Sequence, residues 1–162
     1  MVLSLDTSLA STGYCIGDRE GNIVTYGKIP TNAKDFKNED FRMNYVCDEV
    51  DKLIKEYNIK EMVVEDQFQS VNAKTILCLR KLIGGIMRVA YNNNIPVTYY
   101  YPVTWRKALD LNKSKDKKFA SYEYLLKQGL SIGEFKTTGK YKIDDICDAC
   151  CIYLSYIKRG RK

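Results

Sequence analysis

The chain has 162 residues, 45% of them hydrophobic, which suits one globular domain with a sizeable core over residues 1–162. Its formal net charge of +6 is compatible with an anionic partner. It contains no histidine, which excludes zinc sites of histidine and cysteine, Ser-His-Asp triads and nucleases that use histidine as base or nucleophile. Proton transfer would have to depend on carboxylates, lysine or water held by a metal ion.

The first predicted elements are strands over residues 2–6, 12–16 and 23–28, with a turn at 18–22. Because only short segments separate these strands, they are predicted to form an antiparallel meander. A helix is then predicted over residues 41–57, and its apolar face is expected to contain Phe41, Tyr45, Val46, Val50, Leu53, Ile54 and Tyr57.

The second half alternates between strands and helices. Strands are predicted at 61–65 and 97–101, and a long helix at 72–93 has an apolar stripe that fits either the core or a dimer contact. A helical turn at 104–109 and helices at 116–128 and 144–157 follow, with residues 129–142 as a loop and 157–162 as a basic tail. The helix at 116–128 is expected to be anchored by Phe119, Tyr122 and Leu126.

This element order predicts the fold class. Three antiparallel strands followed by βα units indicate an α/β protein with a mixed five-stranded sheet and helices on both faces. That is the ribonuclease-H-like (RNase H-like) arrangement. In it, the first strand lies in the middle of the sheet and the last helix packs across the sheet.

The six cysteines are predicted to be reduced and mostly buried. Cys147 and Cys150 form a C-x-x-C, but no second pair follows at zinc spacing. Because the sequence begins with a strand-like run, no signal peptide is expected, and no apolar stretch is long enough to cross a bilayer. A cytoplasmic protein without a membrane partner is therefore expected.

Four carboxylates are the candidate site. Asp6 and Glu65 each end an apolar strand, while Asp145 and Asp148 share one face of the last helix. The fold would bring them together, and clustered carboxylates suit Mg²⁺, a hard cation that prefers oxygen ligands. Each acid alone could be an ordinary strand-end or helix-start residue. Asp144, one position off that face, is interpreted as a capping residue, with a ligand role as the alternative.

Basic residues surround these acids. Between positions 67 and 115, eight lysines and arginines oppose one acid, Asp110. Further lysines precede the acidic pair, and the chain ends in a basic run. This distribution favours an enzyme that acts on a polyanion, although solvated helix faces could have the same composition.

The motifs Leu5-Asp6-Thr7-Ser8, Val64-Glu65-Asp66-Gln67-Phe68 and Asp145-Ile146-Cys147-Asp148 together resemble the RuvC family of Holliday-junction resolvases, over nearly the whole chain. The length and the heavy use of Lys, Ile, Asn and Tyr resemble its phage-encoded branch. The resemblance implies a homodimer that nicks four-way junctions symmetrically, and other branched DNA as well, in the cytoplasm of a host cell if the chain is phage-encoded.

The resemblance also assigns roles to residues. It implies that Asp6, Glu65, Asp145 and Asp148 hold two Mg²⁺ ions, for which Mn²⁺ substitutes. Phe68 would stack on bases near the crossover, and the long helix at 72–93 would form the dimer contact. A lysine near the scissile phosphate is expected from the 115–118 cluster, with Lys117 or Lys118 favoured. Further DNA contacts are assigned to Arg80, Lys81, Lys107, Lys113 and Lys115.

Two alternatives keep the fold but change the function. One is a ribonuclease H acting on RNA–DNA hybrids, which needs no aromatic wedge and can work as a monomer. The other is a junction-binding protein without activity, against which the intact acid set argues. A sugar kinase of the actin-like fold is more distant, because Gly84-Gly85 lies inside a predicted helix and not in a phosphate loop.

Overall fold

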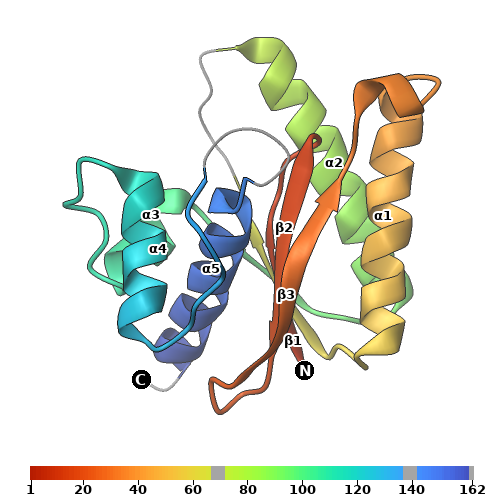
Figure 1. Ribbon diagram of the computed structural model, residues 1–162. Coiled ribbons are helices and arrows are strands. Elements are labelled where there is room, and N and C mark those ends of the chain that lie inside the picture. Colours follow the sequence, from red (N-terminus) through yellow and green to blue (C-terminus); the bar gives the residue numbers. More distant parts are fainter. Residues whose placement is uncertain (67–71, 137–141, 161–162) are drawn as a thin grey trace.

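The computed structural model describes residues 1–66, 72–136 and 142–160, and its centre is one mixed sheet (Figure 1). The strand order is β3-β2-β1-β4-β5, so β1 is central. β1 pairs antiparallel with β2 and parallel with β4; β2–β3 is antiparallel and β4–β5 parallel. The predicted sheet is confirmed, and its strands are β1 (Val2–Asp6), β2 (Ser11–Gly17), β3 (Ile23–Pro30), β4 (Glu61–Glu65) and β5 (Val97–Tyr100).

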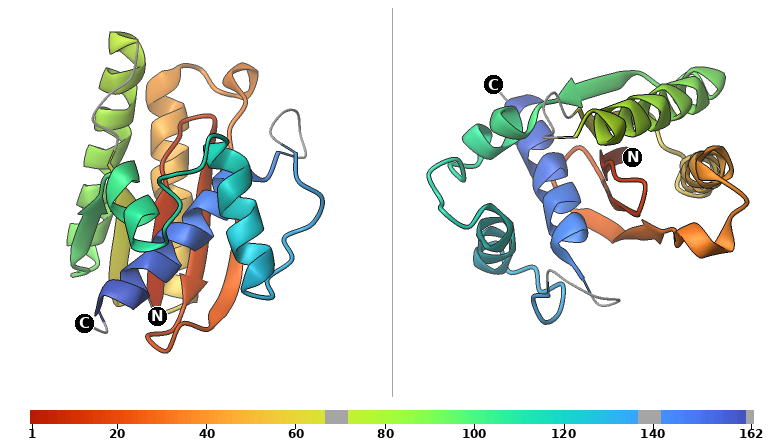
Figure 2. Two further views of the ribbon diagram at one scale, coloured as in Figure 1. Left: turned by 90° about the vertical axis from the view of Figure 1, so that its left-hand side faces the viewer. Right: turned by 90° about the horizontal axis from the view of Figure 1, so that it is seen from above.

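Helices cover both faces of this sheet, as predicted. On one face lie α1 (Glu39–Glu56) and α2 (Ala73–Asn92). On the other, α5 (Asp144–Gly160) lies directly against β1 and β2, and it separates the sheet from α4 (Lys117–Lys127) (Figure 2). The short α3 (Pro102–Ala108) also packs on α5, and a 3-10 turn at Ala33–Asp35 was not predicted. Within the described ranges, no helix combines the length and hydropathy needed to span a membrane.

Strand periodicity decides which side chains face α5. In β1, Leu3 and Leu5 belong to the core beneath α1 and α2, whereas Val2 belongs to the core beneath α5. Ser4 confirms this alternation, since its hydroxyl donates to the carbonyl of Ala149 in α5 at 2.7 Å. Position 6 therefore turns its carboxylate toward α5 as well.

The predicted core face of α1 is partly wrong. Phe41 and Tyr45 are 54% and 38% exposed, whereas Val50 is buried as predicted and Met43, which was not predicted, is buried too. The buried stripe is rotated away from the aromatic residues, and Tyr45 instead lies beside Phe36 of the preceding segment, with ring centroids 5.3 Å apart.

The predicted anchors of α4 also need correction. Phe119 and Leu126 are exposed, and the neighbouring Leu125 is fully buried against α5 instead. Phe119 packs on Phe135 and Tyr122, with ring centroids 5.3 and 5.9 Å away, so an aromatic cluster outside the main core replaces the expected core contact.

The start of α3 and the end of α5 differ from the predicted helix boundaries. α3 begins at Pro102, two residues early, because proline is well suited to the first helical position. α5 runs through Gly160, so the predicted tail at 157–162 begins inside a helix. Ile157 is buried there, and the Arg159 guanidinium lies 5.2 Å from the centre of the Tyr100 ring.

Gly13 lets the first turn of α5 approach the sheet. It pairs directly with Asp6 across β1 and β2. A Cβ atom at position 13 would overlap the backbone carbonyl of Asp145, which is not free to move aside. The absent side chain therefore brings the acids of α5 close to the acid of β1.

We expect Gly13→Ala to push the start of α5 away from the sheet. Overpacking of this kind costs roughly 1–3 kcal/mol of unfolding free energy, measurable by urea denaturation. Gly160→Ala, at the far end of the same helix, places a Cβ in open space and should change stability little. Equal stability of the two variants would show that α5 does not depend on this close approach.

Candidate active site

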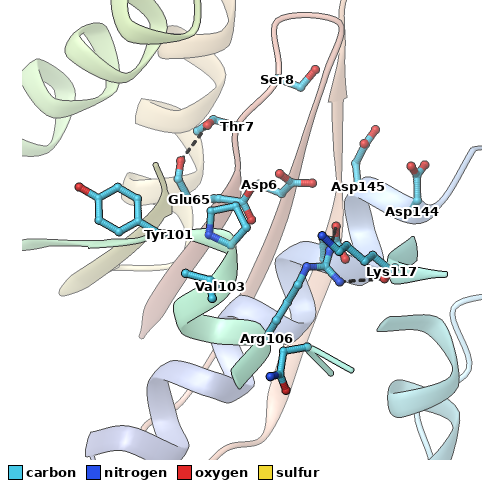
Figure 3. A pocket seen from close by; sticks show the side chains of 13 residues that line it. Asp6, Thr7, Ser8, Glu65, Tyr101, Val103, Arg106, Lys117, Asp144 and Asp145 are labelled. Atoms are coloured by element: carbon cyan, nitrogen blue, oxygen red, sulfur yellow. Dashed lines mark hydrogen bonds and ion pairs between the residues drawn. The ribbon is translucent and has the colours of Figure 1, made fainter. Parts of the chain in front are cut away.

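The predicted acids converge on one pocket of about 1000 Å³ at the ends of β1 and β4 and the start of α5 (Figure 3). Figure 3 shows Asp6 near the centre, Glu65 on one side and Asp144 and Asp145 on the other. Asp144 lines the wall as well, although its sequence position suggested a capping residue. The carboxylates of the wall are Asp6, Glu65, Asp144, Asp145 and Asp148.

Asp6 is the electrostatic centre of this pocket. Its pKa is raised well above the usual range, first by burial and then by the charges of Glu65, Asp148 and Asp145. Lys142 opposes this shift. Asp6 is therefore in electrostatic reach of every other predicted acid, and the pocket has an excess of negative charge.

Glu65 is held by the only tryptophan of the chain. The indole Nε1 of Trp105 donates to Glu65 Oε2 at 2.6 Å, and both side chains are buried. The hydroxyl of Thr7 donates to the backbone carbonyl of Glu65 at 3.0 Å, which links the ends of β1 and β4. The orientation of this acid thus depends on α3 as well as on its own strand.

Asp148 is held by two donors from other elements. Arg106 Nη2 donates to its Oδ2 at 2.9 Å, and the hydroxyl of Ser121 donates to its Oδ1. Burial raises the pKa of Asp148 to about 6, although the charge of Arg106 lowers it. Arg106 Nη1 also donates to the carbonyl of Lys117 at 2.8 Å. One buried guanidinium therefore connects an acid of α5 to the first residue of α4.

Sequence reasoning missed Arg106 as a member of the site and chose its neighbour Lys107, which is exposed. A signal was present. If Pro102 begins α3, helical spacing places Trp105, Arg106 and Leu109 on one side, and all three are buried. The predicted helical turn at 104–109 already contains all three positions, so their spacing indicates this side without the exact helix start.

Asp145 and Asp144 are compensated by Lys142. Its Nζ lies 2.8 Å from Asp145 Oδ1 and 3.4 Å from Asp144 Oδ1. The second oxygen of Asp145, Oδ2, is buried and has no hydrogen-bond partner in the described part of the chain. Burying a carboxylate oxygen without a partner is unfavourable, so a cation or a hydrogen-bond donor is expected beside it.

The predicted basic residues divide into two groups. Lys117 lines the pocket, as expected of the favoured lysines, whereas the Lys118 side chain lies outside the described parts. The remaining residues are exposed and do not line the pocket, and Arg80 pairs with Asp66 at 2.9 Å. Phe68 falls outside the described residues. The exposed group comprises Arg80, Lys81, Lys107, Lys113 and Lys115.

The donor set fits a divalent metal ion, although it is not arranged as a finished site. Among the described residues, no three His, Cys, Asp or Glu side chains form a group that could hold an ion as they stand. Protein donors engage Glu65, Asp148 and one oxygen of Asp145 instead. The fit rests on the chemistry: oxygen-only ligands, the raised pKa of Asp6 and the unpartnered Asp145 Oδ2.

An RNase H-like sheet with carboxylates at the ends of β1 and β4 and on the facing helix is typical of the nucleases of this fold. The family model described as "Crossover junction endodeoxyribonuclease RuvC" matches residues 2–155, and the chain belongs to this family. The predicted family is therefore confirmed. Its phage-encoded branch stays a prediction.

Bacterial members show the same relationship in sequence. The RuvC of Fusobacterium nucleatum is 31% identical over 159 residues, covering 96% of this chain and 79% of its own. The RuvC of Alkaliphilus oremlandii is 28% identical over 163 residues, covering 99% and 94%. Both bear the description crossover junction endodeoxyribonuclease.

Two solved structures share the fold. Thermus thermophilus RuvC in complex with Holliday junction substrate superimposes with a TM-score of 0.77 at 16% identity, covering 99% of this chain and 94% of its own. The yeast mitochondrial Holliday junction resolvase Ydc2 gives 0.68 at 18% identity, covering 97% and 77%.

We expect Arg106→Met to be strongly destabilising, because it leaves Asp148, whose side chain is only 16% exposed, without its cation. Breaking one partner of a buried pair costs about 3–5 kcal/mol, and urea denaturation measures it. The matched control is Arg19→Met, since Arg19 pairs with Glu61 at 73% side-chain exposure and such pairs contribute ~0–1 kcal/mol.

Adding Asp148→Asn to Arg106→Met should recover part of the loss, because no unpaired charge then remains buried. Similar losses in Arg106→Met and Arg19→Met would contradict a buried, stability-determining pair.

Proposed function

We propose that this protein is a metal-dependent, structure-selective endodeoxyribonuclease that resolves four-way DNA junctions, and other branched DNA, by paired symmetric nicks. The observation that carries the proposal is the convergence of Asp6, Glu65, Asp145 and Asp148 on one pocket in a RuvC-family chain. A pure DNA-binding protein would gain nothing from this concentration of negative charge beside a polyanion.

The four acids would hold two divalent ions, Mg²⁺ with Mn²⁺ as a substitute, which supply charge neutralisation and an activated water for phosphodiester hydrolysis. The chain contributes the rest. Trp105 orients Glu65, and Arg106 and Ser121 orient Asp148. Lys117 places an ammonium group at the pocket, where it can stabilise charge on the phosphate. Lys118 is the alternative for this role.

DNA binding would depend on the surface beside the pocket. The exposed lysines Lys107, Lys113 and Lys115 belong to α3 and to the segment that follows it, and Arg80 and Lys81 belong to α2. Phosphate contacts of this kind fix position without reading sequence and weaken as salt rises. Phe68 is proposed to stack on an exposed base, which is worth about 1–3 kcal/mol.

A ribonuclease H acting on RNA–DNA hybrids is the second candidate function, because it would use the same acids. A junction-binding protein without activity is the third. We also propose that the protein works in the cytoplasm. Five of its six cysteines are buried and all six are free, as expected where thiols stay reduced.

We propose a homodimer built on α2. Its exposed side carries Leu77 and Tyr91, 65% and 71% exposed, two heptads apart on the same stripe, with Met87 beside them at 53%. Large exposed apolar residues in one stripe are typical of a contact surface.

Asp6→Asn should abolish cleavage while sparing junction binding, because it removes the central carboxylate and little shape. The test uses labelled four-way junctions, forks, linear duplex and RNA–DNA hybrid in Mg²⁺, with binding measured in Ca²⁺. Asp48→Asn, on the exposed side of α1, is the matched control and should cut normally.

Symmetric nicks in junctions but not in duplex or hybrid support the proposal, and added cutting of forks supports a broad debranching role. Hybrid cleavage alone would favour the ribonuclease H alternative. Tight junction binding without cleavage by the wild-type protein would favour the inactive binder.

Leu77→Glu should convert a dimer into a monomer in sedimentation equilibrium, because it places a charge in the apolar stripe of α2. Val24→Glu, at an apolar position of the edge strand β3 that is 51% exposed, should leave the dimer intact. A monomeric wild-type protein, or equal effects of both changes, would contradict a dimer built on α2.

A further inference from the structure

Lys142 is a cation at the entrance of α5, directly before the acidic pair. Its Nζ contacts Asp145 Oδ1 at 2.8 Å and Asp144 Oδ1 at 3.4 Å, and 29% of its side chain is exposed. Its backbone is fixed, since Lys28 Nζ donates to the Lys142 carbonyl at 2.7 Å and the next amide, of Ile143, donates to Lys136 at 2.9 Å. Its side chain can therefore move toward solvent while the main chain stays in place.

The charge of Lys142 acts on the whole acidic pocket. Burial alone would lower the pKa of Lys142, but the hydrogen bond and charge of Asp145, together with Asp144, outweigh burial and raise it. The same ammonium group lowers the pKa of Asp6, against the acids that raise it. Lys142 is thus a counter-cation for acids on both β1 and α5.

Among the described side chains, the pocket has fewer cations than carboxylates. Five carboxylates line it, and the described cations that line it or pair with these acids are Arg106, Lys117 and Lys142, so these eight groups have a formal charge of −2. Arg106 is buried and tied to both Asp148 and Lys117. Lys142 is less enclosed than Arg106, and its ammonium holds the acids that a metal ion would have to use.

We propose that Lys142 determines how tightly this pocket binds divalent metal ions, because it occupies the cation position beside Asp144 and Asp145 and must leave before an ion can bind them. The inference rests on the proposed metal-dependent function and adds a determinant of metal affinity to it. In Figure 3, Asp144 and Asp145 lie across the pocket from Glu65. Lys142 should therefore weaken binding most on the α5 side.

The chain contains its own reporter for the opposite side. Trp105 is the only tryptophan, and its indole donates to Glu65 Oε2. An ion that binds Glu65 changes the charge beside the indole and hence its emission. Tryptophan fluorescence thus follows the Glu65 side, while calorimetry counts binding over the whole pocket.

The experiment titrates the metal-free, full-length protein with Mn²⁺ in the absence of DNA, using calorimetry and Trp105 fluorescence. We expect Lys142→Met to bind Mn²⁺ about tenfold more tightly than wild type, which corresponds to ~1.4 kcal/mol. Lys142→Arg retains the cation and should bind like wild type. Lys127→Met removes an exposed lysine at the far end of α4 and controls for the change in net charge.

Thermal unfolding with and without Mn²⁺ provides a second readout, in which Lys142→Met should show the larger rise in Tm because a tighter ligand stabilises the folded state more. Lys142→Gln replaces Lys142→Met if the latter does not fold. Equal or weaker Mn²⁺ binding by the neutral variants would overturn the inference.

The outcomes separate the two proposals. If Lys142→Met binds Mn²⁺ more tightly but the wild-type protein does not cleave junctions, the role of Lys142 is supported and the nuclease function is contradicted. If wild type and Lys142→Met bind Mn²⁺ equally and the wild-type protein cleaves junctions, the nuclease function is supported and the role of Lys142 is contradicted. If neither wild type nor Lys142→Met binds Mn²⁺, both proposals are overturned.

Discussion

Buried carboxylates repel one another, and this constraint governs the end of the sheet around Asp6. Three elements bring acids to the same pocket, and the pKa of Asp6 rises because burial and its neighbours disfavour a further negative charge. The fold offsets this cost with a separate donor for each neighbour: Trp105 for Glu65, Arg106 for Asp148 and Lys142 for Asp145. Among the described side chains of the pocket, carboxylates still outnumber cations, and a divalent ion would supply positive charge there.

Local patterns were enough to predict the sheet and the acids. A period of two in β1 and β4 places Asp6 and Glu65 on the face that α5 covers, and a spacing of three places Asp145 and Asp148 on one side of that helix. The meander followed by βα units then leaves few ways to connect the strands, so the central place of β1 followed from the order of elements.

The partners of these acids could not be predicted in the same way, because they depend on contacts between distant segments. Arg106 meets Asp148 across 42 positions of sequence, so helical spacing can place Arg106 beside Trp105 but cannot identify the acid that it contacts. The importance of Gly13 appears only when the carbonyl of Asp145 is placed against it. The predicted core face of α1 was partly wrong for a related reason. Phe41 is apolar enough for a core position, but the sheet lies under the neighbouring stripe of α1.

The donors of the pocket differ in how firmly they are held, and this difference separates Trp105 and Arg106 from Lys142. Trp105 and Arg106 are buried and engaged on more than one side, since the guanidinium also lies 4.2 Å from the indole ring. They can orient Glu65 and Asp148 but cannot leave without a large loss of stability. The Lys142 side chain is 29% exposed, against 10% for Arg106, so its ammonium is less enclosed. Under the proposed function, metal binding would exchange this ammonium for a divalent ion while the buried donors keep the geometry of the acids.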